Sequence, residues 1–197
     1  MESAPPPVRH PPAARPADSS DLARRIADAC LLRGTFTLRS GRTSTYYLDK
    51  YRFSSRPELL GPVADHLADR AAALLAAHAD APHRLAGAEL GGIPLVTAAA
   101  LRLGLPMVFV RNAKKDYGTA KQLEGALEAG DAVVLLEDVA TTGGQSVEAA
   151  TVLRDAGATV AGVIATIDRQ EGARENIEAA GLRFEALFTA RDLGVTE

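Results

Sequence analysis

The sequence has little of several features that define specialised protein classes. Among its 197 residues are one cysteine and no tryptophan, and the formal net charge at pH 7 is −3. The single Cys30 excludes an internal disulfide and a cysteine zinc cluster, so a reducing cytoplasm is the simplest setting. The slight negative charge argues against a nucleic-acid partner bound through overall positive charge. No apolar run approaches the roughly 18 residues of a membrane span, so we expect no membrane partner either.

Residues 1–20 differ in composition from the rest of the chain. They hold six of the eleven prolines and almost no large apolar side chain. Ordering them would bury too little surface to offset the lost chain entropy. They also lack the apolar stretch of a signal peptide. We therefore expect a disordered, proline-rich tail, followed by a single domain over 21–197, whose core is supplied by a chain that is 47% hydrophobic.

Beyond the tail, helix-like and strand-like segments alternate. The expected helices are 21–33, a long segment that begins after Pro57, 93–103, 145–156 and 174–180. The expected strands are 36–39, 45–50, 84–88, 107–111, 132–137, 158–167 and 184–188. The first two strands, separated by Ser-Gly-Arg, predict a hairpin. The others predict an α/β fold with a mainly parallel, twisted sheet flanked by helices, whose ligands lie at the carboxyl ends of the strands.

One segment, 133–144, combines a strand with a loop suited to a sugar phosphate. Its sequence is VVLLEDVATTGG. Glu137 and Asp138 follow the apolar run and suit the hydroxyls of a ribose or a cation. The segment then enters a helix through Thr141, Thr142, Gly143 and Gly144. Backbone N–H groups, hydroxyls and a helix N-terminus favour a phosphate, so the segment predicts a ligand with a phosphate and a vicinal diol. The alternative is an ordinary glycine turn with two capping acids.

This segment resembles the 5-phosphoribosyl-1-pyrophosphate (PRPP) signature of type I phosphoribosyltransferases. Other segments are similar to the orotate phosphoribosyltransferases of that superfamily: FTLRSGRTSTYY at 36–47, LGGIP at 90–94, RNAKKDYGTAKQLEG at 111–125 and IDRQE at 167–171. Together they cover about residues 21–194 in the family's order. The resemblance implies the type I phosphoribosyltransferase fold, with a small helix and hairpin hood from about 21–56 and a core from about 57–197.

The resemblance also implies an activity. PRPP and orotate would be the substrates, and orotidine 5′-monophosphate and pyrophosphate the products, in pyrimidine biosynthesis. Mg²⁺ would be the cofactor, bound mainly through PRPP, with Asp138 as the candidate protein ligand. In this family residues equivalent to 112–125 form a mobile catalytic loop that acts at the neighbouring subunit's site, which implies a homodimer.

Site residues carry over one by one from the matching motifs. The catalytic residues would be Lys115, Asp116 and Asp138. Glu137 and Asp138 would hold the ribose hydroxyls, while residues 141–144 enclose the 5-phosphate. The remaining PRPP-binding residues implied by the resemblance are Arg111, Lys115, Tyr117 and Gly91.

Orotate would be bound by a second group of residues. Arg169 would face its carboxylate, to which a planar guanidinium offers paired donors. Arg39 and Thr141 complete this group near the base. Tyr46 and Tyr47 either flank the base or are packing residues of a strand, and both interpretations stay open.

Three positions depart from the family's pattern. Asn112 stands where many members have a second loop lysine, which Lys114 or Lys121 would have to replace. Gly91 stands where some members have another lysine, so backbone N–H groups would serve the pyrophosphate there. Tyr117 replaces a histidine of some bacterial members, an alternative that also occurs within the family.

Two rival functions follow from the same motifs. A transferase for another base would share the PRPP loop, but Arg169 and the segment at 36–47 count against it. A PRPP-sensing protein without turnover is the second rival, which Lys115 and Asp116 oppose and Asn112 and Gly91 favour. The histidines are at positions 10, 66, 78 and 83 and lack the partners of a nucleophile or metal site, so we expect structural or exposed roles for them.

Overall fold

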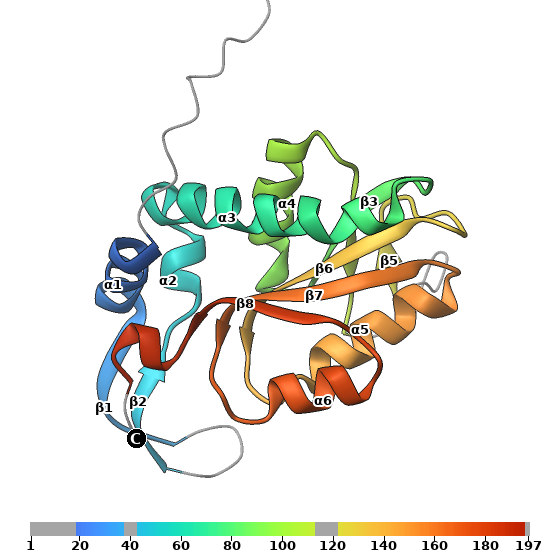
Figure 1. The fold of residues 1–197 in the computed structure, drawn as a ribbon. Helices are drawn as coiled ribbons and strands as arrows, with labels where there is room; N and C mark the ends of the chain where they lie inside the picture. Colours follow the sequence, from blue (N-terminus) through green and yellow to red (C-terminus); the bar gives the residue numbers. More distant parts are fainter. Residues whose placement is uncertain (1–18, 38–42, 113–121, 196–197) are drawn as a thin grey trace, which may run out of the picture.

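The structure is a computed structural model that describes residues 19–37, 43–112 and 122–195 (Figure 1). This part of the chain forms a six-stranded sheet in the order β5-β4-β3-β6-β7-β8 and a separate two-stranded hairpin, β1-β2. Every neighbouring pair in the large sheet is parallel except β4 and β5. The predicted α/β class, with a mainly parallel sheet, is therefore confirmed.

The elements follow one another in the alternating order that the sequence predicts. The helices are α1 (Ser19–Cys30), α2 (Tyr51–Ser54), α3 (Pro57–Leu75), α4 (Gly92–Leu103), α5 (Gly144–Asp155) and α6 (Ala173–Ala179), with 3-10 turns η1 (Ala76–His78) and η2 (Arg191–Leu193). The strands are β1 (Leu31–Thr37), β2 (Thr43–Leu48), β3 (His83–Ala88), β4 (Met107–Val110), β5 (Leu123–Glu124), β6 (Ala132–Ala140), β7 (Thr159–Asp168) and β8 (Phe184–Thr189).

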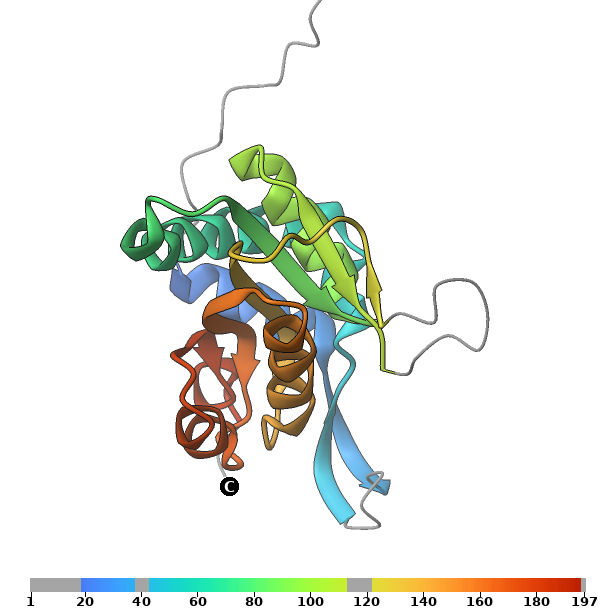
Figure 2. The same cartoon turned by 90° about the vertical axis from the view of Figure 1, so that its right-hand side faces the viewer.

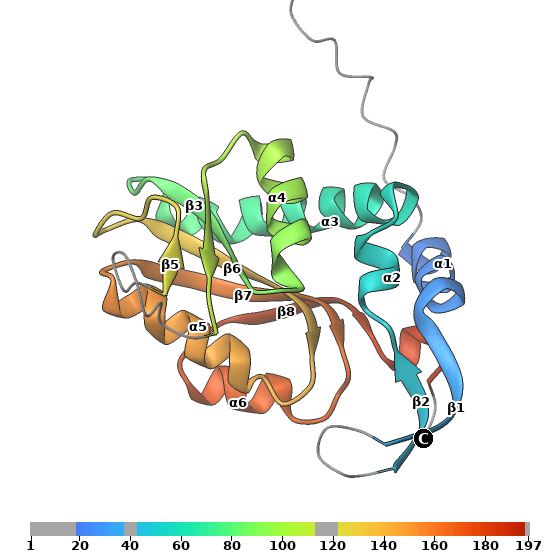
Figure 3. The same ribbon diagram turned by 180° about the vertical axis from the view of Figure 1, so that it is seen from behind.

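The large sheet is covered on both faces. Helices α3 and α4 lie on one face, and α5 and α6 lie on the other (Figures 1 and 3). Side chains of β6 alternate between the two resulting apolar clusters, because successive residues of a strand point to opposite faces. Val134 and Leu136 belong to the cluster of α3 and α4, whereas Val133 and Leu135 belong to the cluster of α5 and α6. This alternation continues into the polar end of β6.

Helices α1 and α2 and the β1-β2 hairpin form a smaller unit beside the sheet, which we call the hood. Its hairpin extends away from the sheet (Figure 2). The hood is joined to the core through buried apolar residues, among them Leu22, Ile26 and Phe53, which are in the same cluster as Phe188 of β8. Because of this shared cluster, side chains of the hood reach the carboxyl ends of the core strands.

Several predicted boundaries were wrong. Helix α1 begins at Ser19 and ends at Cys30 rather than at residue 33, because residues 31–33 instead pair with β2. Strand β6 runs to Ala140 rather than residue 137, since its pairing with β7 continues to Asp168. The sequence signalled neither α2 nor β5. Of the predicted tail, Ser19 and Ser20 belong to α1, and residues 1–18 lie outside the described residues.

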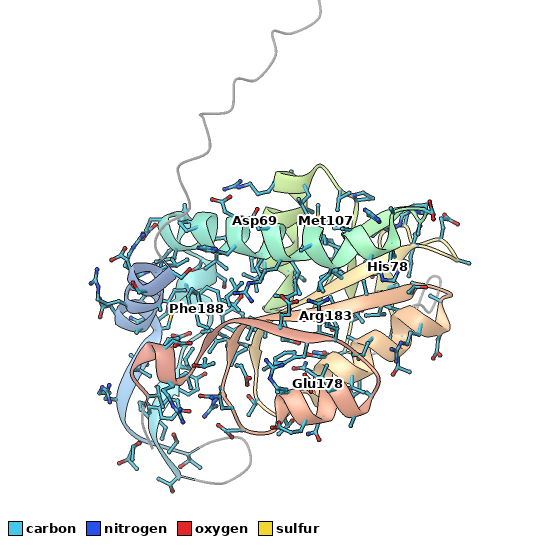
Figure 4. The ribbon with its side chains drawn as sticks, in the orientation of Figure 1. Asp69, His78, Met107, Glu178, Arg183 and Phe188 are labelled. Carbon is cyan, nitrogen blue, oxygen red and sulfur yellow. The ribbon has the colours of Figure 1, made fainter. Side chains whose placement is uncertain are left out.

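None of the helices within the described ranges combines the length and apolar character that a membrane crossing requires. His78 and His83 lie at the amino end of β3, away from the carboxyl ends of the strands. His83 begins β3, and its Nε2 lies 3.0 Å from the carbonyl oxygen of His78. Figure 4 shows His78 at the opposite side of the molecule from the hood.

A buried ion pair stabilises the amino ends of β3 and β6. Arg84 Nε donates to Asp131 Oδ2, which also accepts the N–H of Glu128 at 2.7 Å. Both side chains are largely buried, with 14% and 1% of their surface exposed. Removing one partner of such a pair leaves an uncompensated buried charge.

We expect Asp131→Ala to lower the free energy of unfolding by roughly 3–5 kcal/mol, measured by urea denaturation. Asp65→Ala is the matched control, because Asp65 pairs with Arg102 at 2.6 Å on the surface. The control should cost less than about 1 kcal/mol. Equal losses in the two variants would contradict the role given to the buried pair.

Candidate active site

The two acids at the end of β6 point to opposite faces of the sheet. Glu137 continues the face of α5, and its Oε2 accepts a hydrogen bond from Ser146 of that helix at 3.1 Å. Asp138 continues the other face and meets Lys50 of the hood. Only 6% of Glu137 and 1% of Asp138 is exposed. Glu137 and Asp138 therefore lie on opposite faces of the sheet near the end of one strand.

A cavity of about 500 Å³ opens where β6 passes into α5. It is lined by Asn112, Glu137, Val139, Ala140, Thr141, Thr142, Gly143, Gly144, Gln145, Ser146 and Glu148. All four predicted phosphate-loop residues thus line one cavity at the N-terminus of a twelve-residue helix. Free backbone N–H groups and the helix dipole make this position favourable for an anion. We call it the loop cavity.

Helix α6 holds the loop in place. Gly143 has a φ of 77°, and a Cβ there would lie 2.8 Å from Ile177 Cγ1 and 3.0 Å from the Ala173 carbonyl oxygen. Only glycine therefore allows both the turn and this close approach. Asn176 Nδ2 donates to the carbonyl oxygen of Thr142 at 2.9 Å. The shape of the loop thus depends on residues about 30 positions further along the chain.

Gly91 leaves room for the Asp138 carboxylate. A Cβ at position 91 would lie 1.5 Å from Asp138 Oδ2 and 2.4 Å from its Cγ. Contacts this short do not occur between nonbonded atoms, so any side chain at position 91 would displace the acid. The position of Asp138 therefore explains why residue 91 is a glycine and not the lysine that some members of the similar family have there.

Asp138 is neutralised from the hood. Lys50 Nζ donates to Oδ1 at 3.2 Å and lies 2.9 Å from Oδ2. Oδ1 also accepts the N–H of Val139 at 2.6 Å. The contact of Lys50 with Oδ2 lacks hydrogen-bond geometry, and within the described residues this buried oxygen has no hydrogen-bond partner. Lys50 therefore pairs with both oxygens of Asp138, and only Oδ1 has hydrogen bonds of good geometry in the described part of the chain.

The charged groups of this cluster shift the pKa values of Glu137 and Lys50. Burial raises the pKa of the Glu137 carboxyl, the neighbouring Asp138 charge raises it further, and the Ser146 hydrogen bond offsets only part of the shift. Burial would lower the pKa of Lys50, but the charge of Asp138 and its hydrogen bond outweigh that effect and raise it. Lys50 is therefore a charged partner for Asp138, and Glu137 holds its proton more tightly than an exposed glutamate does.

Comparison with known proteins identifies the family that this geometry belongs to. The model of the phosphoribosyl transferase domain matches residues 62–180. The orotate phosphoribosyltransferase of Natronomonas pharaonis is 49% identical over 176 residues, which are 89% of this chain and 96% of that relative. The chain belongs to the orotate phosphoribosyltransferases. The resemblance predicted from the separate motifs is thereby confirmed.

Solved structures of the family share this fold. The Mycobacterium tuberculosis orotate phosphoribosyltransferase in complex with PRPP is 31% identical with a TM-score of 0.72, over 91% of this chain and all of that one. The Aeropyrum pernix orotate phosphoribosyltransferase is 32% identical with a TM-score of 0.72, over 87% of this chain and 95% of that one. The similarity therefore includes the hood as well as the core.

A second cavity, of about 550 Å³, lies between the hood and the end of β7, and we call it the hood cavity. It is lined by Tyr46, Arg169, Gln170, Glu171, Glu175, Ala190, Arg191 and Val195. Arg169 Nη2 donates to the Tyr46 hydroxyl at 2.9 Å and lies 2.8 Å from Glu171 Oε1. The Arg169 N–H donates to the carbonyl oxygen of Ala140, a residue of the loop cavity, at 2.9 Å. One hydrogen bond therefore joins the walls of the two cavities.

The two tyrosines of β2 have different environments. Tyr46 is 8% exposed, with the Arg169 guanidinium 5.1 Å from its ring centre. Tyr47 is 46% exposed and packs on Phe36 with ring centres 5.7 Å apart. Of the two, Tyr46 lines the hood cavity. The structure thus brings Tyr46 and Arg169 together and leaves Tyr47 apart from them.

Arg111 and Asn112 follow β4 at the edge of the loop cavity. The N–H of Asn112 donates to Glu89 Oε1 at 2.8 Å, and its Oδ1 accepts from Gln145 at 3.0 Å. Arg111 lies 3.7 Å from Glu124, and its buried Nε has no hydrogen-bond partner in the described part of the chain. These contacts fix the start of segment 112–125 against β3 and α5.

Four predicted site residues lie outside the described residues: Arg39, Lys115, Asp116 and Tyr117. Their predicted roles stay predictions. The sequence interpretation, in turn, missed Lys50, Glu89, Gln145, Ser146 and Asn176. Lys50, Ser146 and Asn176 contact predicted site residues. Glu89 and Gln145 contact Asn112, and none of the five lies in a motif that the sequence interpretation used.

We expect Glu137→Gln to stabilise the unliganded protein above about pH 5, because the folded state resists ionisation of this buried acid. Near or below the ordinary pKa of 4.5, Glu137 is protonated in both states, so the substitution should change little. As the pH rises, the unfolded chain loses this proton first and the wild type loses stability relative to the variant.

Urea denaturation of both proteins between about pH 4 and pH 8 measures this difference. Asp69→Asn, a substitution of an exposed acid on α3 (Figure 4), is the control and should show no such trend. A Glu137→Gln effect that is destabilising, or the same at every pH, would contradict the raised pKa.

Proposed function

We propose that the protein transfers the phosphoribosyl group of PRPP to N1 of orotate, giving orotidine 5′-monophosphate and pyrophosphate in pyrimidine biosynthesis. Its membership of the orotate phosphoribosyltransferases, with relatives that match most of the chain, supports this reaction. The observation that carries the donor half is the buried, unsatisfied Asp138 Oδ2 at the end of the strand that leads into the phosphate loop.

PRPP binds across the end of β6 in this proposal. Its 5-phosphate lies over residues 141–144, where backbone N–H groups and the threonine hydroxyls donate to it. Its ribose hydroxyls donate to Glu137 and to Asp138 Oδ2. Gly91 and Arg111 border the pyrophosphate, with the backbone of Gly91 as the donor there.

Orotate binds in the hood cavity beside Tyr46. Its carboxylate pairs with Arg169, whose guanidinium now contacts Glu171 and the Tyr46 hydroxyl. Arg169 Nε is buried without a hydrogen-bond partner among the described residues, so one donor of this guanidinium is free for the base. A cavity lined by a stacked tyrosine and arginine suits a planar, anionic pyrimidine. We keep Arg39 and Thr141 as further contacts of the base, and Tyr47 as a packing residue.

The chemical difficulty is the departure of a highly charged pyrophosphate from the ribose. Arg111 and Lys115 stabilise this charge, and Lys115 is the main catalytic residue, with Asp116 and Tyr117 beside it. The carboxylates at 137 and 138 hold the ribose while it gains oxocarbenium character. Orotate is an anionic nucleophile and needs no strong general base. Closure of segment 112–125 excludes water, which would otherwise hydrolyse PRPP.

Mg²⁺ is the cofactor in this proposal. Within the described ranges no group of three or more His, Cys, Asp or Glu side chains can hold a metal ion by itself. That fits a cation held mainly by substrate phosphates with one or two carboxylates, which is the usual coordination of Mg²⁺. Asp138 is the candidate protein ligand, and the ion would supply charge neutralisation of the pyrophosphate.

We further propose a cytoplasmic homodimer in which segment 112–125 of one subunit serves the site of the other. The family resemblance supports the dimer. The single cysteine supports a reducing compartment.

The reaction is tested with purified protein, PRPP, Mg²⁺ and orotate. We expect loss of orotate absorbance and release of pyrophosphate in equal amounts. Turnover with a purine but not with orotate would contradict the proposed acceptor. PRPP binding without turnover on any base would favour a sensor.

Lys115→Ala should lower kcat by about 100-fold or more, because Lys115 acts on the charge that develops during reaction. Orotate affinity, measured by calorimetry, should change little. Equal losses of turnover and of orotate binding would remove Lys115 from this role.

Gly91→Ala should weaken PRPP binding by roughly tenfold or more, because the new Cβ displaces Asp138 from the ribose. Gly61→Ala on α3 is the matched control, since a Cβ there meets nothing nearer than Arg102 Nη2 at 3.7 Å. Calorimetric titration with PRPP and Mg²⁺ compares the two. Unchanged affinity in Gly91→Ala would contradict the proposed position of the ribose.

A further inference from the structure

Lys50 is fixed in the hood by its backbone. It follows β2 and directly precedes α2, whose Phe53 is fully buried. Its N–H donates to the carbonyl oxygen of Leu48 at 3.0 Å, and its carbonyl oxygen accepts from the Ser54 hydroxyl at 3.4 Å. The side chain therefore starts from a defined position and spans from the hood to the core.

The tip of this side chain reaches an acid of the donor site 88 positions away. The Lys50 ammonium lies 5.6 Å from the centre of the Tyr51 ring and contacts both oxygens of Asp138. Asp138 is 1% exposed, whereas the side chain of Lys50 is 35% exposed. A buried carboxylate requires a partner of opposite charge, so the contact with Lys50 compensates the burial of Asp138.

The two oxygens of the Asp138 carboxylate differ in their hydrogen bonds. Lys50 and Val139 both donate to Oδ1, which leaves Oδ2 without a hydrogen bond in the described part of the chain. Oδ2 is also the oxygen that occupies the space beside Gly91. Lys50 therefore contacts both oxygens of the carboxylate, 3.2 Å from Oδ1 and 2.9 Å from Oδ2, and fixes its orientation beside Gly91.

We propose that Lys50 is a positioning residue of the donor site, which holds the Asp138 carboxylate in the orientation in which it accepts a ribose hydroxyl of PRPP. The inference rests on the proposed function, because it assigns the hydroxyl contact of the same reaction. It adds a residue of the hood to the machinery for the donor, which otherwise lies in the core.

The test compares two ligands that differ by one hydroxyl, ribose 5-phosphate and 2-deoxyribose 5-phosphate. Their affinities are measured by calorimetry for the wild type, Lys50→Met and Lys50→Arg. Arg52→Met is the matched control, since Arg52 is a neighbouring cation that lies 3.9 Å from the exposed Asp49. Lys50→Gln is a second neutral variant if the methionine protein does not fold.

The wild type should bind ribose 5-phosphate more tightly than the deoxy sugar. Lys50→Met should lose this preference, with a fall of roughly 10- to 100-fold in ribose 5-phosphate affinity and little change for the deoxy sugar. Lys50→Arg should retain part of the preference, and Arg52→Met all of it. In steady-state assays, the KM for PRPP should rise in Lys50→Met while the KM for orotate stays the same.

Three results would overturn the role of Lys50. Equal weakening of both sugars would make Lys50 a structural residue only. Weaker PRPP binding with unchanged ribose 5-phosphate binding would make it a pyrophosphate contact instead. If the wild type turns over PRPP and orotate but the Lys50 variants keep the hydroxyl preference, this inference is wrong and the proposed function still holds. A wild type without turnover contradicts the proposed function itself.

Discussion

The burial of one carboxylate, Asp138, constrains the rest of the site. At 1% exposure its carboxyl group needs hydrogen-bond donors and a cation nearby, and the structure supplies the Val139 N–H and Lys50. Its position also requires glycine at 91, because a side chain there would overlap it. The hood, the turn between β3 and α4, and strand β6 therefore meet at the Asp138 carboxyl group. A change in any of the three alters the acid that we assign to the ribose.

The alternation of a β-strand explains how one segment serves several parts of a ligand. Glu137 points to the face of α5 and Asp138 to the face of the hood, so consecutive acids line different walls at one strand end. The chain then turns at Gly143 into α5, where the helix N-terminus faces the loop cavity. The N–H of Arg169 donates to Ala140, and the side chain of Arg169 lines the hood cavity. The hood cavity therefore adjoins the same edge of the sheet. Donor and acceptor cavities therefore lie against one sheet edge.

Much of the fold was predictable because its elements are long or strongly apolar. Helix α3 was expected after Pro57 and includes that proline as its first residue, and the apolar run before Glu137 is indeed part of the strand β6. The prediction failed where the secondary structure depends on a strand that pairs with the segment. Residues 31–33 pair with β2, and the two-residue strand β5 pairs with β4. In the site, the phosphate loop was predictable because its chemistry is local. Lys50 was not, since nothing near it in the sequence points to an acid far along the chain.

The most direct measurement of the central claim, that Asp138 with its free Oδ2 receives the ribose, is a crystal structure with PRPP and Mg²⁺ bound. We predict a ribose hydroxyl at about 2.5–3.0 Å from Asp138 Oδ2. Lys50 should remain on Oδ1, and the 5-phosphate should lie over residues 141–144. A ribose whose hydroxyls face away from Asp138, or a 5-phosphate bound outside the loop cavity, would contradict it.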